Sequence, residues 1–217
     1  MQTTISGVKI PDSKMARDVT TFVRDTEGPM LFTHSMRVYL WAALAGERDK
    51  LTFDPELLYV AAMFHDFGLV EHYHESKYRF EVDGANAARD FLREHGIPEH
   101  DVRDIWLAIA LHTSPGIPEH LGSEISLLHT GAVMDVIGRG YDQFTEAQRK
   151  AVLDAYPRDK SFNLGIIETF YEALRKRPQT TYGSLNADYL AFKDPHFRRG
   201  DVCSLILGSQ WAEPAHR

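Results

Sequence analysis

The segment AAMFHDFGL, residues 61–69, decides how the rest of the chain is interpreted. It continues an apolar run that starts behind Asp54, an N-cap residue followed by proline at the first helical position. The run ends in the adjacent pair His65-Asp66, two side chains that can bind metals or transfer protons. This pattern predicts a buried helix with potential metal-binding or catalytic side chains at its C-terminal end.

Helical patterns also occupy most of the chain on both sides of this segment. Apolar residues recur at intervals of three and four, and no stretch shows a convincing alternation typical of a strand. We expect helices at 13–25, 33–45, 54–65, 82–95, 98–112, 123–138, 145–156 and 162–176, with short ones near 186–192 and 202–208. The sequence therefore predicts an all-α fold, a bundle of about seven to nine helices.

Length and composition favour one globular unit. The 217 residues are 43% hydrophobic and 25% charged, and no repeat, low-complexity tract or linker divides them. We expect a single domain over 1–217, with the motifs in a core of about 30–140 and further helices and an irregular tail over 141–217. The first residues lack the order of a signal peptide, and no span approaches the roughly 20 apolar residues of a membrane helix. We therefore expect a cytoplasmic protein without a membrane partner.

Charge and cysteine content narrow the function classes. The net charge is −7, and no run of Lys or Arg forms a basic stripe, so nucleic-acid binding is not expected. Eleven histidines stand against a single cysteine, Cys203, which can form neither an internal disulfide nor a thiolate metal site. Any metal must therefore be held by imidazoles and carboxylates.

Four residues on three predicted helices form a candidate ligand set. His34 lies near the start of one helix, His65 and Asp66 end the next, and Asp135 lies within an entirely apolar stretch. A buried carboxylate is costly unless it is paired or bound to a metal, so something cationic should meet Asp135. Two imidazoles and two carboxylates would suit a divalent transition ion, with room for water.

The motifs resemble those of a known superfamily. The order His, His-Asp, Asp on successive helices resembles the HD-domain superfamily of metal-dependent hydrolases, over about residues 30–140. The strings FTHSMRVYLWA (32–42), AAMFHDFGL (61–69), FEVDGANAARDFL (80–92) and LHTGAVMDVIG (128–138) are similar to its cyanamide hydratase-type branch. The resemblance implies an HD-domain helical bundle in which His34, His65, Asp66 and Asp135 hold one divalent ion. Zinc is the usual ion of such hydratases, with Fe²⁺ or Mn²⁺ as alternatives.

The reaction that the resemblance implies is the addition of water to cyanamide, giving urea. A bound divalent ion lowers the pKa of its water and so supplies hydroxide, and it also polarises the small nitrile substrate. Protonation of the nitrile nitrogen then needs a donor. We expect His112, Asp66 and His72 to be catalytic, and Glu71, His74 and Lys77 to bind substrate from a polar loop. His112 could instead cap its helix or bind a second metal, and Glu81 and Asp83 are expected to cap the helix that follows them.

Three alternatives stay open. A phosphohydrolase or phosphodiesterase is the commoner HD activity, but the lysine of its HDxGK pattern is Leu69 here, so Lys77, Arg79 or Arg37 would have to meet the phosphate charge. A di-iron oxygenase would need two further imidazoles, for which only His112 and His129 offer themselves. A degenerate module that binds without turnover has no reason to bury Asp135. The partner is a small molecule in each catalytic case, and a homodimer is compatible with all of them.

Overall fold

The computed structural model describes residues 3–210, and in that range the fold is all-α, as predicted. The α-helices are α1 (Lys14–Thr26), α2 (Pro29–Asp49), α3 (Pro55–Phe64), α4 (Phe80–Glu94), α5 (Glu99–Leu111), α6 (Ser123–Ile137), α7 (Glu146–Ala155), α8 (Phe162–Leu174), α9 (Ala187–Lys193) and α10 (Val202–Leu207). Short 3-10 turns join them: η1 (Phe67–Leu69), η2 (Glu71–Tyr73), η3 (Pro118–His120), η4 (Tyr141–Gln143) and η5 (Pro178–Thr181). Two short strands, β1 (Thr4–Ile5) and β2 (Val8–Lys9), pair as an antiparallel hairpin.

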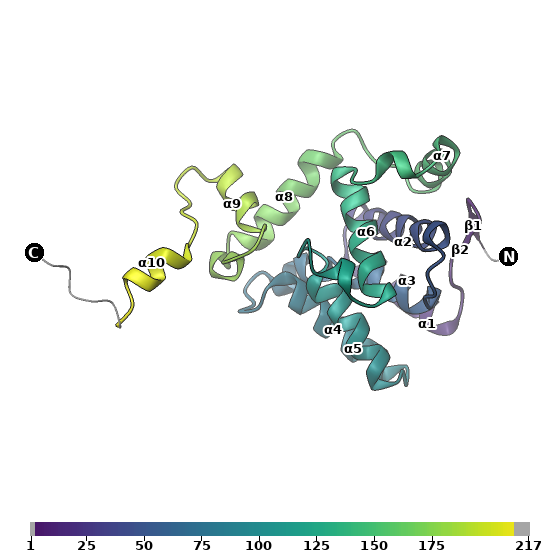
Figure 1. Ribbon diagram of the computed structural model, residues 1–217, viewed down its shortest axis with the longest axis horizontal. Coiled ribbons are helices and arrows are strands. Elements are labelled where there is room, and N and C mark those ends of the chain that lie inside the picture. Colours follow the sequence, from purple (N-terminus) through teal and green to yellow (C-terminus); the bar gives the residue numbers. More distant parts are fainter. Residues whose placement is uncertain (1–2, 211–217) are drawn as a thin grey trace, which may run out of the picture.

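Helix α2 runs through the centre of the bundle and packs most extensively against α6 (Figure 1). Every residue from 34 to 46 is buried, so this helix has no solvent face over that length. Gly131 on α6 allows the close approach, because a Cβ there would lie 2.3 Å from the carbonyl oxygen of Val38. The two helices therefore meet almost backbone to backbone, one turn before Asp135.

The end of α3 is fixed against α4 by a second close approach. A Cβ on Gly84 would lie 2.5 Å from the carbonyl oxygen of Phe64, so only glycine lets α4 pass this close. His65 and Asp66 follow Phe64 directly and turn into η1. The close packing of α4 thus fixes the backbone that carries the His-Asp pair, independently of side-chain contacts.

The C-terminal helices cover the bundle on the side away from the hairpin (Figure 1). Helix α8 buries Phe162, Ile166 and Phe170 in a second apolar cluster. Just beyond α8, the fully buried Arg177 donates hydrogen bonds to the carbonyl oxygen of Gly68 at 2.6 Å and to Asp83 at 2.5 Å. This guanidinium ties the C-terminal segment to the turn that follows the His-Asp pair.

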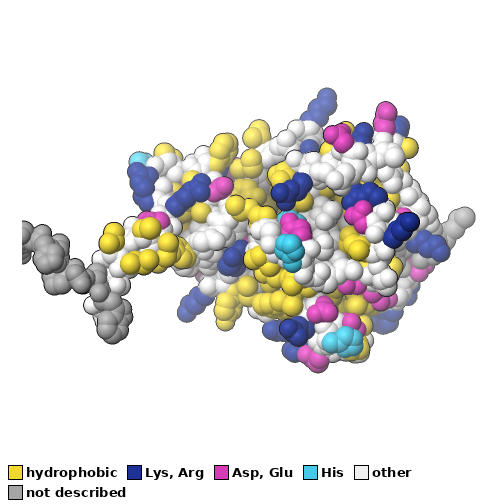
Figure 2. Space-filling model, in the orientation of Figure 1, with side chains coloured by type: hydrophobic (Ala, Val, Ile, Leu, Met, Phe, Trp, Pro, Cys, Tyr) yellow, Lys and Arg dark blue, Asp and Glu magenta, His cyan; other side chains and the backbone are white. Residues whose placement is uncertain are grey.

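Helix α10 lies beyond this cluster, at the far C-terminal end of the described chain (Figure 1). Its large apolar side chains, Val202, Leu205, Ile206 and Leu207, are all exposed. Figure 2 shows hydrophobic side chains gathered on the surface over this helix. Cys203 on the same helix is exposed too. Within residues 3–210 no helix has the length and hydropathy needed to cross a bilayer.

Several predicted boundaries were wrong, each for a local reason. Helix α2 begins at Pro29 rather than Thr33, and the Thr33 hydroxyl bonds to carbonyl oxygens of the preceding turn instead of capping. The helix continues through Gly46, which packs against Phe53 rather than ending it. The hairpin was not predicted because its strands are only two residues long and its turn depends on positive φ angles near Gly7.

Candidate metal centre and its pocket

His34, His65 and Asp66 meet in the interior of the bundle. All three are almost fully buried, and one ligand atom from each lies within 4.8 Å of the others. His34 comes from the second turn of α2, and the other two come from the end of α3. Chain segments 31 residues apart are thus joined in the cluster that the sequence predicted.

Hydrogen bonds to the other ring nitrogens decide what the two imidazoles present to each other. Nδ1 of His34 lies 2.7 Å from Oδ2 of Asp135, and Nδ1 of His65 lies 2.7 Å from the carbonyl oxygen of Ala62. Because both partners are acceptors, each Nδ1 must carry the proton. The two Nε2 atoms lie 3.2 Å apart, and in the neutral rings each of them carries a lone pair and no proton. Such an arrangement needs a proton or a metal ion between them.

The spacing of the three ligand atoms fits a divalent ion. Nε2 of His34 and Nε2 of His65 lie 3.5 Å and 3.4 Å from Oδ2 of Asp66. Ligands about 2.1 Å from a tetrahedral ion lie about 3.4 Å from one another, so the observed separations match three corners of a tetrahedron. The other Asp66 oxygen, Oδ1, is buried without a hydrogen bond in the part of the chain described. Nitrogen and carboxylate donors in this arrangement suit zinc, iron or manganese.

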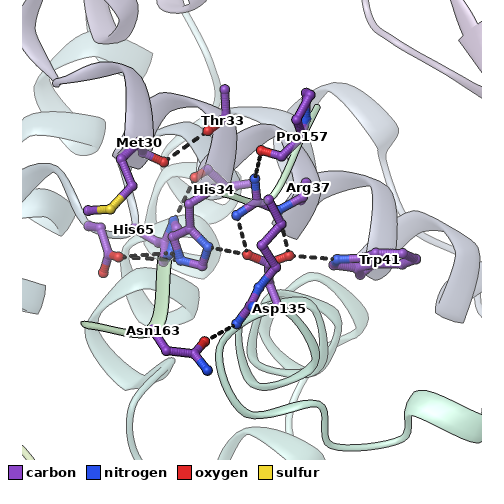
Figure 3. Close-up of polar contacts among 12 residues, drawn as sticks. Met30, Thr33, His34, Arg37, Trp41, His65, Asp135, Pro157 and Asn163 are labelled. Carbon is purple, nitrogen blue, oxygen red and sulfur yellow. Dashed lines mark hydrogen bonds and ion pairs between the residues drawn. The ribbon is translucent and has the colours of Figure 1, made fainter. Parts of the chain in front are cut away.

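Asp135 lies behind His34 and is not part of this group (Figure 3). Its Oδ1 accepts hydrogen bonds from Nε of Arg37 at 2.8 Å and from the indole of Trp41 at 2.9 Å. Its Oδ2 accepts from Arg37 at 2.8 Å and from His34. Both oxygens are therefore engaged in hydrogen bonds, and the one from Nδ1 of His34 orients that imidazole. The cation that the sequence required near this carboxylate is the buried guanidinium of Arg37.

The buried charges shift one another's protonation. Burial would lower the pKa of His34, but the hydrogen bonds that its ring donates to Asp135 and Asp66 outweigh it and raise that pKa to about 9. Burial lowers the pKa of His65 to about 4, and the neighbouring His34 adds to this. Burial would raise the pKa values of both carboxylates, yet the imidazoles, and Arg37 for Asp135, hold them well below their usual range. Without metal the two Nε2 atoms therefore hold one proton between them, on His34.

A cavity of about 270 Å³ opens from the His34, His65 and Asp66 cluster. His112 and His129 also line it, and both donate Nδ1–H to backbone carbonyl oxygens at 2.7 Å. The Nε2 of His112 lies 3.6 Å from Oδ1 of Asp66, and the buried Nε2 of His129 has no hydrogen bond from a described residue. His129 and Asp135 share α6 but face different sides of His34, as their spacing of six residues requires.

The polar loop after the His-Asp pair does not reach this cavity. Glu71 and His74 line a separate hollow between η2 and α8, while His72 and Lys77 do not line the cavity either. The side chain of His74 bonds back to the carbonyl oxygen of Leu69 at 3.0 Å. The predicted substrate-binding and proton-donating roles of these four residues are thus not supported by their positions. The physical reason is that η1 and η2 turn the chain away from the ligands immediately after Asp66.

Other residues of the site escaped the prediction. Arg37 and Trp41 follow His34 at helical spacings of three and seven, a signal that was present in the sequence. Glu81 caps no helix: it is fully buried and accepts hydrogen bonds from Arg79, Thr113 and Asn186. Asp83 is likewise buried and binds Arg177 rather than capping α4. Asn186 and Tyr189 line the cavity from the C-terminal segment, where no sequence pattern marked them.

Comparison with known families agrees with this architecture. A model of the HD domain matches residues 31–159, which is 129 of the 217 residues and includes the whole His34, His65 and Asp66 cluster. No curated protein matches the chain significantly. The match supports no particular branch, so the cyanamide hydratase-type resemblance stays a hypothesis. The buried ligand cluster and the family match together show that the chain belongs to the HD domain family of metal-dependent hydrolases.

Proposed function

We propose that this protein is a metal-dependent hydro-lyase that adds water to a small, uncharged, nitrile-like substrate, with the hydration of cyanamide to urea as the leading reaction. A divalent ion held by His34, His65 and Asp66 would lower the pKa of a water and polarise the nitrile. Zinc is the ion we propose, with iron and manganese as the alternatives to test.

The character of the cavity wall carries this proposal. Apart from the histidines and Asp66, the wall is built mainly of apolar side chains from α6, α8 and the segment before α9, among them Val133, Val136 and Phe170. A cavity of about 270 Å³ suits a substrate of few heavy atoms. Such a wall favours a small uncharged molecule over an anion, because beyond the metal ligands and the largely exposed Arg139 it offers an anion no charged partner to replace its hydration.

The cations that a phosphate would need are already engaged. Arg37 holds Asp135, and Arg79 donates to the buried Glu81 at 2.7 Å. Arg139 lines the cavity but is largely exposed and lies 3.9 Å from a carboxylate oxygen of Glu119. Lys77 does not line the cavity. This distribution of charge disfavours the phosphohydrolase alternative.

His112 is the proton donor that we propose for the nitrile nitrogen. Its Nδ1–H is held by the carbonyl oxygen of Ile109, so Nε2 is the position that exchanges protons with the cavity. Nε2 lies 3.6 Å from Oδ1 of Asp66, so the ring faces the metal ligands from the cavity wall. The reaction balances without another reactant: water supplies the oxygen and both protons that turn N≡C–NH₂ into urea.

The direct test is to assay urea after zinc-loaded protein is incubated with cyanamide. We expect urea from the wild type, no urea from His65→Ala, and unchanged turnover in His100→Ala, which replaces an exposed histidine on α5. Failure to form urea with zinc, iron and manganese would contradict the proposal. Phosphate release from nucleotides in the same samples would instead support the phosphohydrolase.

One observation favours a second candidate, a di-iron oxygenase. Oδ1 of Asp66 and Nε2 of His129 are both buried without a hydrogen bond from a described residue, although Nε2 of His129 lies 3.4 Å from Oε1 of Glu119, and His112 lines the same cavity. Two further imidazoles are what a second ion would require. Elemental analysis separates the candidates: about one zinc per chain supports the hydratase, and two irons per chain support the oxygenase.

A further inference from the structure

We propose that Asn186, in the C-terminal segment, selects substrates that carry an N–H group beside the carbon attacked by water. The substrate class is thereby narrowed to cyanamides and small amides, in which the reacting carbon is bonded directly to an N–H nitrogen. This inference rests on the proposed function and deepens it. Asn186 lies outside residues 31–159, the part of the chain that the HD domain match covers.

The position of Asn186 in its helix is the first observation. It is the N-cap residue of α9, a place where an asparagine side chain normally accepts a hydrogen bond from the helix backbone. Here the side chain makes no such bond. It is instead 2% exposed, lines the cavity, and donates from Nδ2 to Oε1 of Glu81 at 2.9 Å. The side chain therefore does not stabilise the start of α9, and it forms part of the cavity wall instead.

Glu81 fixes which end of the amide faces the cavity. A carboxylate that already accepts hydrogen bonds from Arg79 and Thr113 is ionised and can only accept, so Nδ2 must be the atom that meets it. The carbonyl oxygen Oδ1 of Asn186 is then the free end of the amide, and no hydrogen bond from a described residue reaches it. A free acceptor on a side chain that lines a mainly apolar cavity is matched by an N–H donor on the substrate.

Tyr189 supplies a matching donor on the same wall. It follows Asn186 by three residues, so the two side chains lie on one face of α9. Its ring stacks on Phe170 with centroids 4.3 Å apart and planes inclined by 14°, which holds the side chain in place. Its hydroxyl makes no hydrogen bond with a described residue, and the side chain lines the cavity. Acceptor and donor side by side suit a molecule that has an N–H and a heteroatom with a lone pair.

The first experiment compares cyanamide with dimethylcyanamide, which has the same nitrile but no N–H. We expect the wild type to prefer cyanamide in kcat/KM, and Asn186→Leu to reduce that preference by about tenfold or more, mainly through KM for cyanamide. Asn186→Ser, a smaller change, should act in the same direction if the leucine variant does not fold. Tyr171→Phe serves as the matched control, because Tyr171 lies on α8 outside the cavity. A preference within twofold of wild type in both Asn186 variants would overturn the inference.

A second experiment separates this inference from the proposed reaction. Binding of urea and of tetramethylurea to the zinc-loaded protein is measured by calorimetry, which needs no turnover. Urea binding that weakens about tenfold in Asn186→Leu supports N–H recognition even if cyanamide is never hydrated. Equal urea binding by wild type and variant, or no urea binding by the wild type, overturns the inference even if urea is formed from cyanamide.

Discussion

The histidines of the cavity share one arrangement. His34, His65, His112 and His129 each donate Nδ1–H to a fixed acceptor, a carboxylate in the first case and a backbone carbonyl in the others. The tautomer of each ring is thereby set, and every Nε2 is left with a lone pair for the interior of the cavity. The lone pairs of His34 and His65 face each other at 3.2 Å and have no stable arrangement without a cation or an added proton. Nε2 of His112 lies 3.6 Å from Oδ1 of Asp66, and Nε2 of His129 lies 3.4 Å from Oε1 of Glu119.

Asp135 affects metal binding by orienting His34, so its replacement should weaken metal binding and should also lower the stability of the fold. Asp135→Ala should lower the free energy of unfolding by about 3–5 kcal/mol, because it leaves the guanidinium of Arg37 buried without its partner. Metal affinity should fall by about 10–100-fold, the effect of losing a carboxylate that orients a ligand. Guanidinium chloride denaturation and metal titration measure the two effects.

Asp135→Asn and His65→Ala are the controls for this prediction. Asp135→Asn keeps the shape but loses the charge, so it should weaken metal binding with less loss of stability. His65→Ala removes a ligand and should abolish measurable binding. Equal and complete loss of metal in folded Asp135→Asn and His65→Ala would mean that Asp135 is itself a ligand.

Protonation of His34 makes the stability of the metal-free protein depend on pH. The folded-state pKa of about 9 is above the ordinary value of 6.5, so the stabilisation is fully present below pH 6.5 and is lost as pH rises through about 9. The loss should be on the order of 3 kcal/mol. Denaturation of metal-free protein at pH 6, 7.5 and 9 measures it. His34→Gln should show a flatter profile, and a wild-type profile equally flat would refute the prediction.

Metal binding is predicted to reverse this trend. Below pH 9 the ion must displace the proton on His34, so binding should release about one proton between pH 7 and 8. Metal affinity should therefore rise with pH over the range in which the metal-free protein loses stability. Calorimetric titrations in buffers of different ionisation enthalpy give the number of protons released. Binding without proton release would contradict the assigned protonation.

At the level of helices, the packing of α2 on α6 positions the site. His34, Arg37 and Trp41 lie on one face of α2, and Asp135 on α6 meets all three. The contact depends on Gly131, where a Cβ would overlap the carbonyl oxygen of Val38. The distance between α2 and α6 at Gly131 thus also determines the hydrogen bonds that Asp135 makes with side chains of α2.

Gly131→Ala tests this dependence. The added methyl group must push α6 away from α2, which should cost about 1–3 kcal/mol of stability and weaken metal binding as His34 loses its orientation. Gly122→Ala is the matched control, because a Cβ at the start of the same helix meets nothing within 4 Å. A Gly131→Ala protein with wild-type stability and metal affinity would show that the helices can separate without consequence.

For the whole molecule, bound metal should contribute to the stability of the fold. The ligands come from α2 and the end of α3, so an ion held between them would bind the folded chain and not the unfolded one. At a free metal concentration about 1,000 times Kd the gain should be about 4 kcal/mol. Thermal unfolding before and after chelation measures it, and the difference should vanish in His65→Ala. Equal Tm values with and without chelator would contradict a metal that links these helices.

The sequence by itself determined the local features of this protein. Apolar spacing located nearly every helix, and the N-cap Asp54 was legible because a cap is a contact between neighbours in the chain. The cluster of His34, His65 and Asp66 followed from residue type and helix position. The burial of Asp135 also followed, since an apolar stretch around a carboxylate leaves it few alternatives.

Only the tertiary structure decided which groups those residues would meet. A buried carboxylate is equally well served by a metal or by a guanidinium, and the packing of α2 on α6 put Arg37 there. The loop after the His-Asp pair carries side chains suited to a site, but the η1 and η2 turns direct it elsewhere. Asn186 reaches the cavity only because the C-terminal segment folds back over 105 residues onto Glu81. Contacts between distant segments depend on how helices pack, and residue spacing along the chain does not encode that directly.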